Sequence, residues 1–144
     1  MTSRRTAVAI QVVGLAFDAV WHGLLHPGFE PVTVSQMVSH LSTVHLPIYM
    51  GVVGVFLTTT WALVDRMGRS RTGIALRVAF AGAAVSTAGE AWHAYGHLRL
   101  STHISPIAEA TAGFGLVVVV IAVWLDGRRA RRRGADHVDE RRAA

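Results

Sequence analysis

Four long apolar stretches, separated by short polar connections, dominate the pattern of the chain. They cover residues 7 to 26, 44 to 64, 74 to 97 and 106 to 125. Each is close to the ~20 residues that an α-helix needs to cross a ~30 Å hydrocarbon layer, because a helix rises ~1.5 Å per residue. The pattern therefore predicts an all-α integral membrane protein with four transmembrane helices in a bundle.

Composition supports this class and bears on the start of the chain. The 144 residues are 51% hydrophobic and 16% charged, which is too apolar for an ordinary small soluble domain. The first apolar stretch follows a basic Ser-Arg-Arg, as a signal peptide would, but Asp18, Trp21 and His22 interrupt it and no small-residue cleavage site follows. We expect this stretch to be retained as the first membrane span.

The distribution of arginine predicts the orientation. The chain has 14 arginines and no lysine. All of them except Arg99 lie near the N-terminus, around the middle connection or in the C-terminal segment. Basic residues collect on the cytoplasmic side, so both termini are expected inside, in the cytoplasmic membrane. Residues 1–127 would form the transmembrane domain, and residues 128–144 a basic disordered tail. Such a tail is expected to contact membrane lipid, and no nucleic-acid partner is predicted.

The two halves of the chain resemble each other. The pattern Trp-His-x-x-x-His occurs at residues 21–26 and again at 92–97, and HLSTVHLPI in the first half is echoed by HLRLSTHISPI in the second. Each half, about 7–64 and about 74–125, has the pattern of a helical hairpin with both ends inside, so the repeats would run parallel. We predict two parallel-repeat hairpins, packed closely through small residues such as glycine.

Most histidines fall in the outer half of this bundle; they are His22, His26, His40, His45, His93, His97 and His103. In the first helix Asp18, His22 and His26 are spaced i, i+4, i+8 and would form one stripe. In the third, Glu90, His93 and His97 are spaced i, i+3, i+7 and would do the same. Asp18 and Glu90 would each lie about 12 Å from the outer ends of their helices. Equal depth predicts one site shared by the two halves.

Two carboxylates near the middle of membrane spans need an explanation. A lone charge there costs at least ~2.5 kcal/mol on insertion scales, so such acids usually face a partner or a cavity and mark function. One interpretation is structural, with Asp18 and Glu90 bonding histidines of neighbouring helices. The other is a metal site, and imidazole and carboxylate without cysteine favour Fe, Zn or Mn. Trp21 and Trp92 fit an aromatic belt at the membrane interface.

Two short elements resemble those of known metalloproteins. Glu90-Ala-Trp-His93 resembles the Glu-x-x-His element of ferritin-like carboxylate bundles, and Glu109 resembles the single Glu that other helices of those bundles supply. The two His-x-x-x-His pairs are similar to the histidine boxes of membrane desaturases and hydroxylases, whose adjacent histidine pairs are missing here. Neither element identifies a family.

The remaining histidines lie near prolines. His40 and His45 are i, i+5, which would separate their directions by about 140° on a regular helix. Pro47 is expected to bend or loosen the preceding turn and thereby aim both imidazoles at the bundle. His103 comes shortly before a Ser-Pro pair that predicts a helix start, and it is either a ligand at the rim or a solvated loop residue.

We therefore predict a small polytopic metalloprotein whose site opens outward, and favour an enzyme. The seven histidines would be the metal ligands. Asp18, Glu90 and Glu109 would be ligands, partners that fix imidazole tautomers, or a general base for metal-bound water. With Fe the chemistry would be O2-dependent oxidation of a lipophilic substrate, and with Zn it would be hydrolysis.

Two alternatives remain open at this point. A b-type haem would be held by two histidines from different helices, such as His45 paired with His22 or His93. A transporter or metal-delivery protein would bind the same ion in transit, and a chain of this size would then be expected to form a homodimer.

Overall fold

The computed structural model describes residues 2–67, 73–100 and 106–143, with side chains described from residue 3 to residue 129 within those ranges. Over this part of the chain the backbone forms five α-helices and one π turn, and no strand. The elements are α1 (Thr2–Val20), the π turn η1 (Trp21–Leu25), α2 (Val34–Thr43), α3 (Leu46–Met67), α4 (Ile74–Leu98) and α5 (Pro106–Ala143). The prediction of an all-α chain is confirmed.

Four helical segments are long and apolar enough to cross a membrane. They are Ser3–Leu25, Leu46–Met67, Ile74–Leu98 and Pro106–Arg129, and each overlaps one of the apolar stretches of the sequence. α5 extends beyond its apolar part to Ala143, so the backbone is helical where a disordered tail was expected. Arginine and alanine, which are frequent in this segment, both have high helix propensity.

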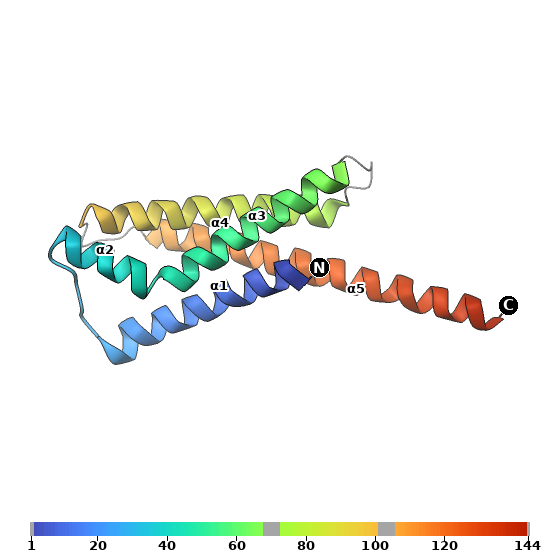
Figure 1. Ribbon diagram of the computed structural model, residues 1–144, viewed down its shortest axis with the longest axis horizontal. Coiled ribbons are helices and arrows are strands. Elements are labelled where there is room, and N and C mark those ends of the chain that lie inside the picture. The colour runs from blue at the N-terminus through green and yellow to red at the C-terminus, as the bar shows by residue number, and fades with distance from the viewer. Residues whose placement is uncertain (1, 68–72, 101–105, 144) are drawn as a thin grey trace.

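The four long helices lie side by side, and the short α2 lies at one end of them (Figure 1). α1 runs toward that end, α3 runs away from it, and α4 and α5 repeat the two directions. The most extensive pairings are α4 with α5 and α1 with α3, while α3 and α4 join the two pairs. We call the end with α2 the histidine end (His22, His40, His45, His93 and His97) and the opposite end the arginine end (Arg4, Arg5, Arg66 and Arg77).

Glycines allow the backbones of each helix pair to approach closely. A Cβ atom on Gly14 of α1 would lie 2.7 Å from the backbone nitrogen of Ile48 in α3. A Cβ atom on Gly82 of α4 would lie 2.9 Å from the carbonyl oxygen of Gly115 in α5. Small residues at such contacts are the usual means by which membrane helices pack, because little else drives helices together in lipid.

Between its two ends the bundle has an apolar interior. A buried cluster joins four helices and consists of Ala7, Val55, Ala83 and Val119. One turn closer to the histidine end, the buried Gln11 of α1 donates from Nε2 to Ser86 Oγ of α4 over 3.1 Å. The interior therefore holds the two helix pairs together by apolar packing and by one polar contact.

α2 begins at a reciprocal pair of hydrogen bonds. The hydroxyl oxygen of Thr33 accepts from the backbone N–H of Gln36 over 3.2 Å, and the Gln36 side-chain oxygen accepts from the backbone N–H of Val32 over 3.1 Å. This arrangement resembles a capping box, in which a hydroxyl and a Glu or Gln three residues later satisfy free N–H groups at a helix start. It starts a short helix in the connection between the first two apolar stretches.

Candidate metal centre

Five histidine rings meet at the histidine end. They come from η1 (His22), from α2 (His40), from the break between α2 and α3 (His45), and from α4 (His93 and His97). The rings form one continuous chain of contacts, with centroid separations of 5.0 Å for His22 and His40, 4.9 Å for His40 and His45, 5.1 Å for His45 and His97, and 4.6 Å for His97 and His93. The structure thus brings both halves of the chain to one cluster.

Three of these rings, the histidine trio (His22, His40 and His45), direct nitrogens at each other. The Nε2 atoms of His22 and His45 each lie 3.2 Å from Nε2 of His40. One nitrogen from each of the three rings lies within 4.8 Å of the other two. Two imidazole nitrogens bound at ~2.05 Å to one tetrahedral ion are roughly 3.4 Å apart. Two of the three nitrogen separations in the trio therefore match ligands of a single metal ion, and the third lies within 4.8 Å.

Hydrogen bonding explains this spacing less well. A nitrogen of a neutral imidazole is either a donor with one proton or an acceptor with one in-plane lone pair. His40 Nε2 faces two nitrogens at the same distance, and it has only one proton or one lone pair to share between them. A metal cation, in contrast, accepts a lone pair from all three nitrogens at once. The three histidines could therefore hold one ion.

The helix ends in a π turn whose C-cap is His26, with φ −136° and ψ 57°, and this end separates two histidines that the sequence analysis placed in one stripe. The backbone N–H of His26 donates to the carbonyl oxygen of Trp21 over 2.8 Å, which is an i to i−5 bond in place of the regular i to i−4 bond. His26 is exposed, and its ring packs against Trp21 with a centroid separation of 4.4 Å. The structure therefore brings His22 into the trio and leaves His26 outside it.

A break in the helix has the opposite effect on another pair. α2 ends at Thr43 and α3 begins at Leu46, so regular helix stops just before Pro47, as its missing N–H and its ring predict. This interruption brings His40 and His45, which a continuous helix would point apart, to an Nε2–Nε2 distance of 3.2 Å. The expected break is confirmed, and it completes the trio.

Asp18 is the carboxylate closest to the trio. Its Oδ1 lies 3.5 Å from His22 Nε2 and 3.5 Å from His45 Nδ1. The same oxygen is buried and has no hydrogen-bond partner among the described residues. A carboxylate next to a metal-binding imidazole fixes the tautomer of the ring and raises its basicity as a ligand. Asp18 is placed to orient His45 or to bind the ion itself.

α4 and α5 add a second group of candidate residues beside the trio. His93 Nε2 lies 2.9 Å from His97 Nε2, and His93 Nδ1 lies 3.8 Å from Glu109 Oε1. The side chain of Glu109 is 61% exposed, so it lies at the rim of the cluster. Glu90 precedes His93 by one turn and is only 8% exposed. Both halves of the chain therefore contribute imidazole and carboxylate to the same end of the bundle.

Burial also sets the protonation of the one trio member that lies on α2. It lowers the pKa of His40 below its ordinary value, and the nearby His22 lowers this pKa further. A lowered pKa keeps an imidazole neutral at pH 7. Neutral imidazole is the form that binds a metal ion, so the surroundings of His40 favour the ligand state.

The sequence analysis missed Tyr49. Its ring stacks on His45 with a centroid separation of 6.0 Å and an interplanar angle of 20°, and its hydroxyl is buried without a hydrogen-bond partner in the described part of the chain. The i, i+4 spacing of His45, just before α3, and Tyr49 on α3 was the available signal. The sequence analysis also missed the start of α2, for which the Thr-x-x-Gln pattern was the available signal.

His103, also expected as a ligand, lies outside the described residues.

Comparison of the chain with protein-family models, with curated proteins and with solved structures finds no match. The geometry of the histidine end therefore carries the functional conclusion.

Proposed function

We propose that the chain is a membrane metalloprotein in which the histidine trio binds one divalent transition-metal ion. The convergence of three Nε2 atoms, two of them 3.2 Å from the third, carries this proposal. Nitrogen and oxygen donors without thiolate favour Zn, Fe or Mn. Three protein ligands also leave a coordination position for water or substrate, as catalytic zinc sites do.

The surroundings of the trio support an enzyme. A metal ion with an exchangeable position lowers the pKa of bound water or activates a bound substrate. Asp18 contacts two of the trio rings, and the buried Glu90 lies one turn before His93 on α4. Either carboxylate would be available as a general base if the trio held an ion. With Zn we propose hydrolysis, and with Fe the O2-dependent oxidation of a lipophilic substrate.

The same geometry favours a non-haem ion over a b-type haem. Two axial imidazoles bind haem iron from opposite faces, so the porphyrin lies between the two rings. In the trio the imidazole rings are neighbours rather than partners on opposite faces of a larger group. Their centroids are 5.0 Å apart for His22 and His40 and 4.9 Å apart for His40 and His45. These separations suit ligands that share one small coordination sphere.

We further propose that the arginine end faces the cytoplasm. α1 begins and α5 leaves the bundle at this end (Figure 1), and basic residues collect on the cytoplasmic side of membrane proteins. The histidine end would then open to the outside. A reporter fused after Ala144 should report a cytoplasmic position. A reporter inserted beside Gly28 should report a position on the outer side of the membrane. The reverse pattern would contradict the proposed orientation.

Metal analysis of detergent-purified protein tests the metal site. We expect about one Zn, Fe or Mn ion per chain and no Soret band. His22→Ala should lose most of the metal because it removes one of three converging nitrogens. His26→Ala is the matched control, since His26 lies four residues away but outside the trio, and it should keep its metal. Normal metal content in His22→Ala would overturn the site, and a strong Soret band lost on His45→Ala would favour haem.

A further inference from the structure

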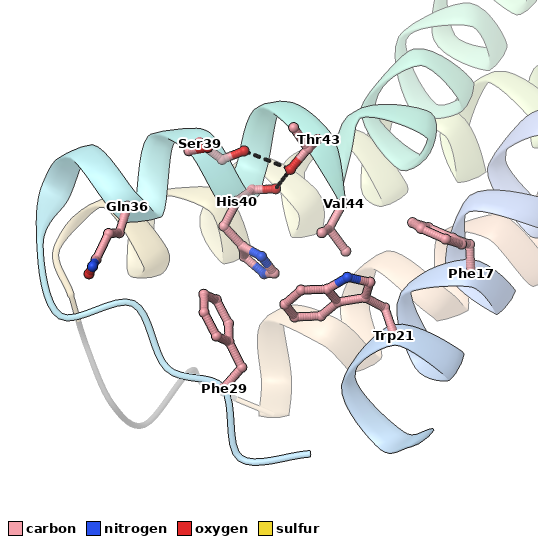
Figure 2. Close-up of a pocket in the computed structure, with 8 residues that line it drawn as sticks. All are labelled: Phe17, Trp21, Phe29, Gln36, Ser39, His40, Thr43 and Val44. Carbon is pink, nitrogen blue, oxygen red and sulfur yellow. Dashed lines mark hydrogen bonds between the residues drawn. The ribbon is translucent and has the colours of Figure 1, made fainter. Parts of the chain in front are cut away.

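A cavity of about 420 Å³ lies directly beside the trio. Its lining includes Phe17 and Trp21 from the end of the first span, Phe29 from the following loop, and Gln36, Ser39 and His40 from α2. The rings of Trp21, Phe29 and His40 pack against one another at its wall (Figure 2). Sites for small molecules usually measure about 300–1,000 Å³ and combine apolar walls with a few polar groups. The cavity has the size and the lining of such a site.

His40 belongs to the cavity and to the trio at the same time. Its Nε2 faces His22 and His45, and its ring also lies 4.8 Å from the Trp21 ring and 5.5 Å from the Phe29 ring between centroids. When a metal ion binds Nε2, the proton of the neutral ring must be on Nδ1. Metal-bound histidines almost always donate this proton to an acceptor. His40 contacts the other trio rings through Nε2, which leaves Nδ1 for an acceptor outside the trio.

The aromatic walls indicate the shape of the occupant. Trp21 and Phe29 stand edge to face, with centroids 5.1 Å apart and an interplanar angle of 89°. Such rings pack well against a flat conjugated ring in offset or edge-to-face geometry. Phe17 and Phe29 are each 43% exposed, and Phe17 lies in a segment apolar enough to cross a membrane. An occupant that is soluble in lipid therefore has direct access.

We propose that this cavity binds a lipid-soluble molecule with a flat quinone-type ring, whose carbonyl oxygen accepts a hydrogen bond from His40 Nδ1. This inference rests on the proposed metal site, because metal on Nε2 fixes the proton on Nδ1. The ring would be held one imidazole away from the ion. The cavity therefore assigns a substrate class to the proposed metalloprotein.

A decyl-substituted benzoquinone is a suitable probe, because quinones quench the fluorescence of an indole that they contact. A chain that keeps only Trp21 isolates the signal of the cavity. It requires Phe in place of the three exposed tryptophans, Trp61, Trp92 and Trp124. We expect saturable quenching of Trp21 in the metal-loaded protein. Removal of the metal by a chelator should weaken binding roughly 10-fold, as for the loss of one hydrogen bond.

Two variants of α2 locate the binding site. Ser39→Phe places a large ring in the cavity and should weaken quinone binding by at least about 10-fold through overpacking. Ser35→Phe lies one turn earlier on the same helix, outside the cavity lining, and should bind as before. Both should keep their metal, because neither serine belongs to the trio.

Metal content measured on the same samples separates the possible failures. Metal-loaded protein without saturable quenching, or equal binding by both serine variants, would overturn the quinone site and leave the metal site standing. Unchanged quinone binding after chelation would overturn the hydrogen bond from His40. Protein that never holds metal would overturn the proposed function, and the inference with it.

Discussion

The two ends of the bundle both carry titratable side chains, but in different arrangements. At the arginine end Arg4 Nη2 lies 3.8 Å from Asp126 Oδ2, so a cation of α1 is matched by an anion of α5. At the histidine end the Nε2 atoms of His22 and His45 each lie 3.2 Å from Nε2 of His40. A matched pair stabilises the contact between two helices, whereas clustered imidazole nitrogens can hold a cation. The arginine end thus has the arrangement of a structural contact, and the histidine end that of a group that could hold a metal ion.

The interior between the ends sharpens this difference. The buried cluster of Ala7, Val55, Ala83 and Val119 is apolar and joins all four long helices, and the buried polar side chains near it are uncharged: Gln11, Thr59 and Ser86. A path for an ion through the bundle would need polar side chains or water along its length. We therefore favour a binding site that opens at one end over a transport route through the bundle.

The largest expected effect comes from a change that damages both ends. A Cβ atom on Gly115 would overlap the backbone of Ser86, so Gly115→Ala forces α5 away from α4. We expect a loss of about 2–3 kcal/mol in the free energy of unfolding, together with loss of metal. Denaturation in detergent and metal analysis measure the two effects.

Gly113→Ala is the matched control for this change. A Cβ atom on Gly113 would meet open space, and alanine is the better helix former. This variant should be as stable as the unaltered protein or slightly more so. Equal stability of the two glycine variants would show that the close contact between α4 and α5 does not hold the ends in place.

A smaller effect, confined to the histidine end, is expected for Asp18→Asn. Asparagine keeps the shape of the side chain but removes the charge that faces His22 and His45. Metal affinity should fall by roughly 10- to 100-fold, with little change in unfolding. Glu30→Gln, at an exposed position of the loop before α2, should leave the affinity unchanged. An Asp18→Asn variant with unaltered metal affinity would reduce Asp18 to a structural residue.

The smallest effect, confined to the arginine end, is expected for Asp126→Asn. Its carboxylate is 26% exposed and 3.8 Å from Arg4, so the ion pair should contribute only about 0.5–1 kcal/mol to stability. Detergent denaturation should show this loss at low salt and less of it at high salt. Metal content should not change. A fall in metal content would mean that the two ends are coupled through the bundle.

The spans could be predicted from the sequence because their signal is local. A run of apolar residues of the length that crosses a membrane has few other uses, and each predicted stretch overlaps a long helix. The involvement of Asp18 with histidines could also be predicted, since a buried charge requires a partner. The likeness of the two halves stays a prediction, because the helices alone do not test it.

The membership of the trio could not be predicted, because it depends on two departures from the regular helix. Spacing arguments assume 3.6 residues per turn, so His22 and His26 looked adjacent while His40 and His45 looked divergent. The end of the helix at His26, after the π turn at Trp21–Leu25, and the break before Pro47 reverse both relations. The proline predicts its break from the sequence, but a π turn has no comparable residue signal. The sequence could therefore predict that His40 and His45 approach each other, but not that His26 lies outside the trio.

One feature of α1 bears on how the chain is made. Arg4, Gln11 and Asp18 follow one another at intervals of seven residues and so lie on one face of the helix. Two of their partners, Ser86 and Asp126, belong to α4 and α5, which the ribosome produces much later. Asp18 finds its partners earlier, in His22 of the same segment and in His45 just before α3. The polar face of α1 is therefore satisfied in two stages, first by the neighbouring segment and only later by α4 and α5.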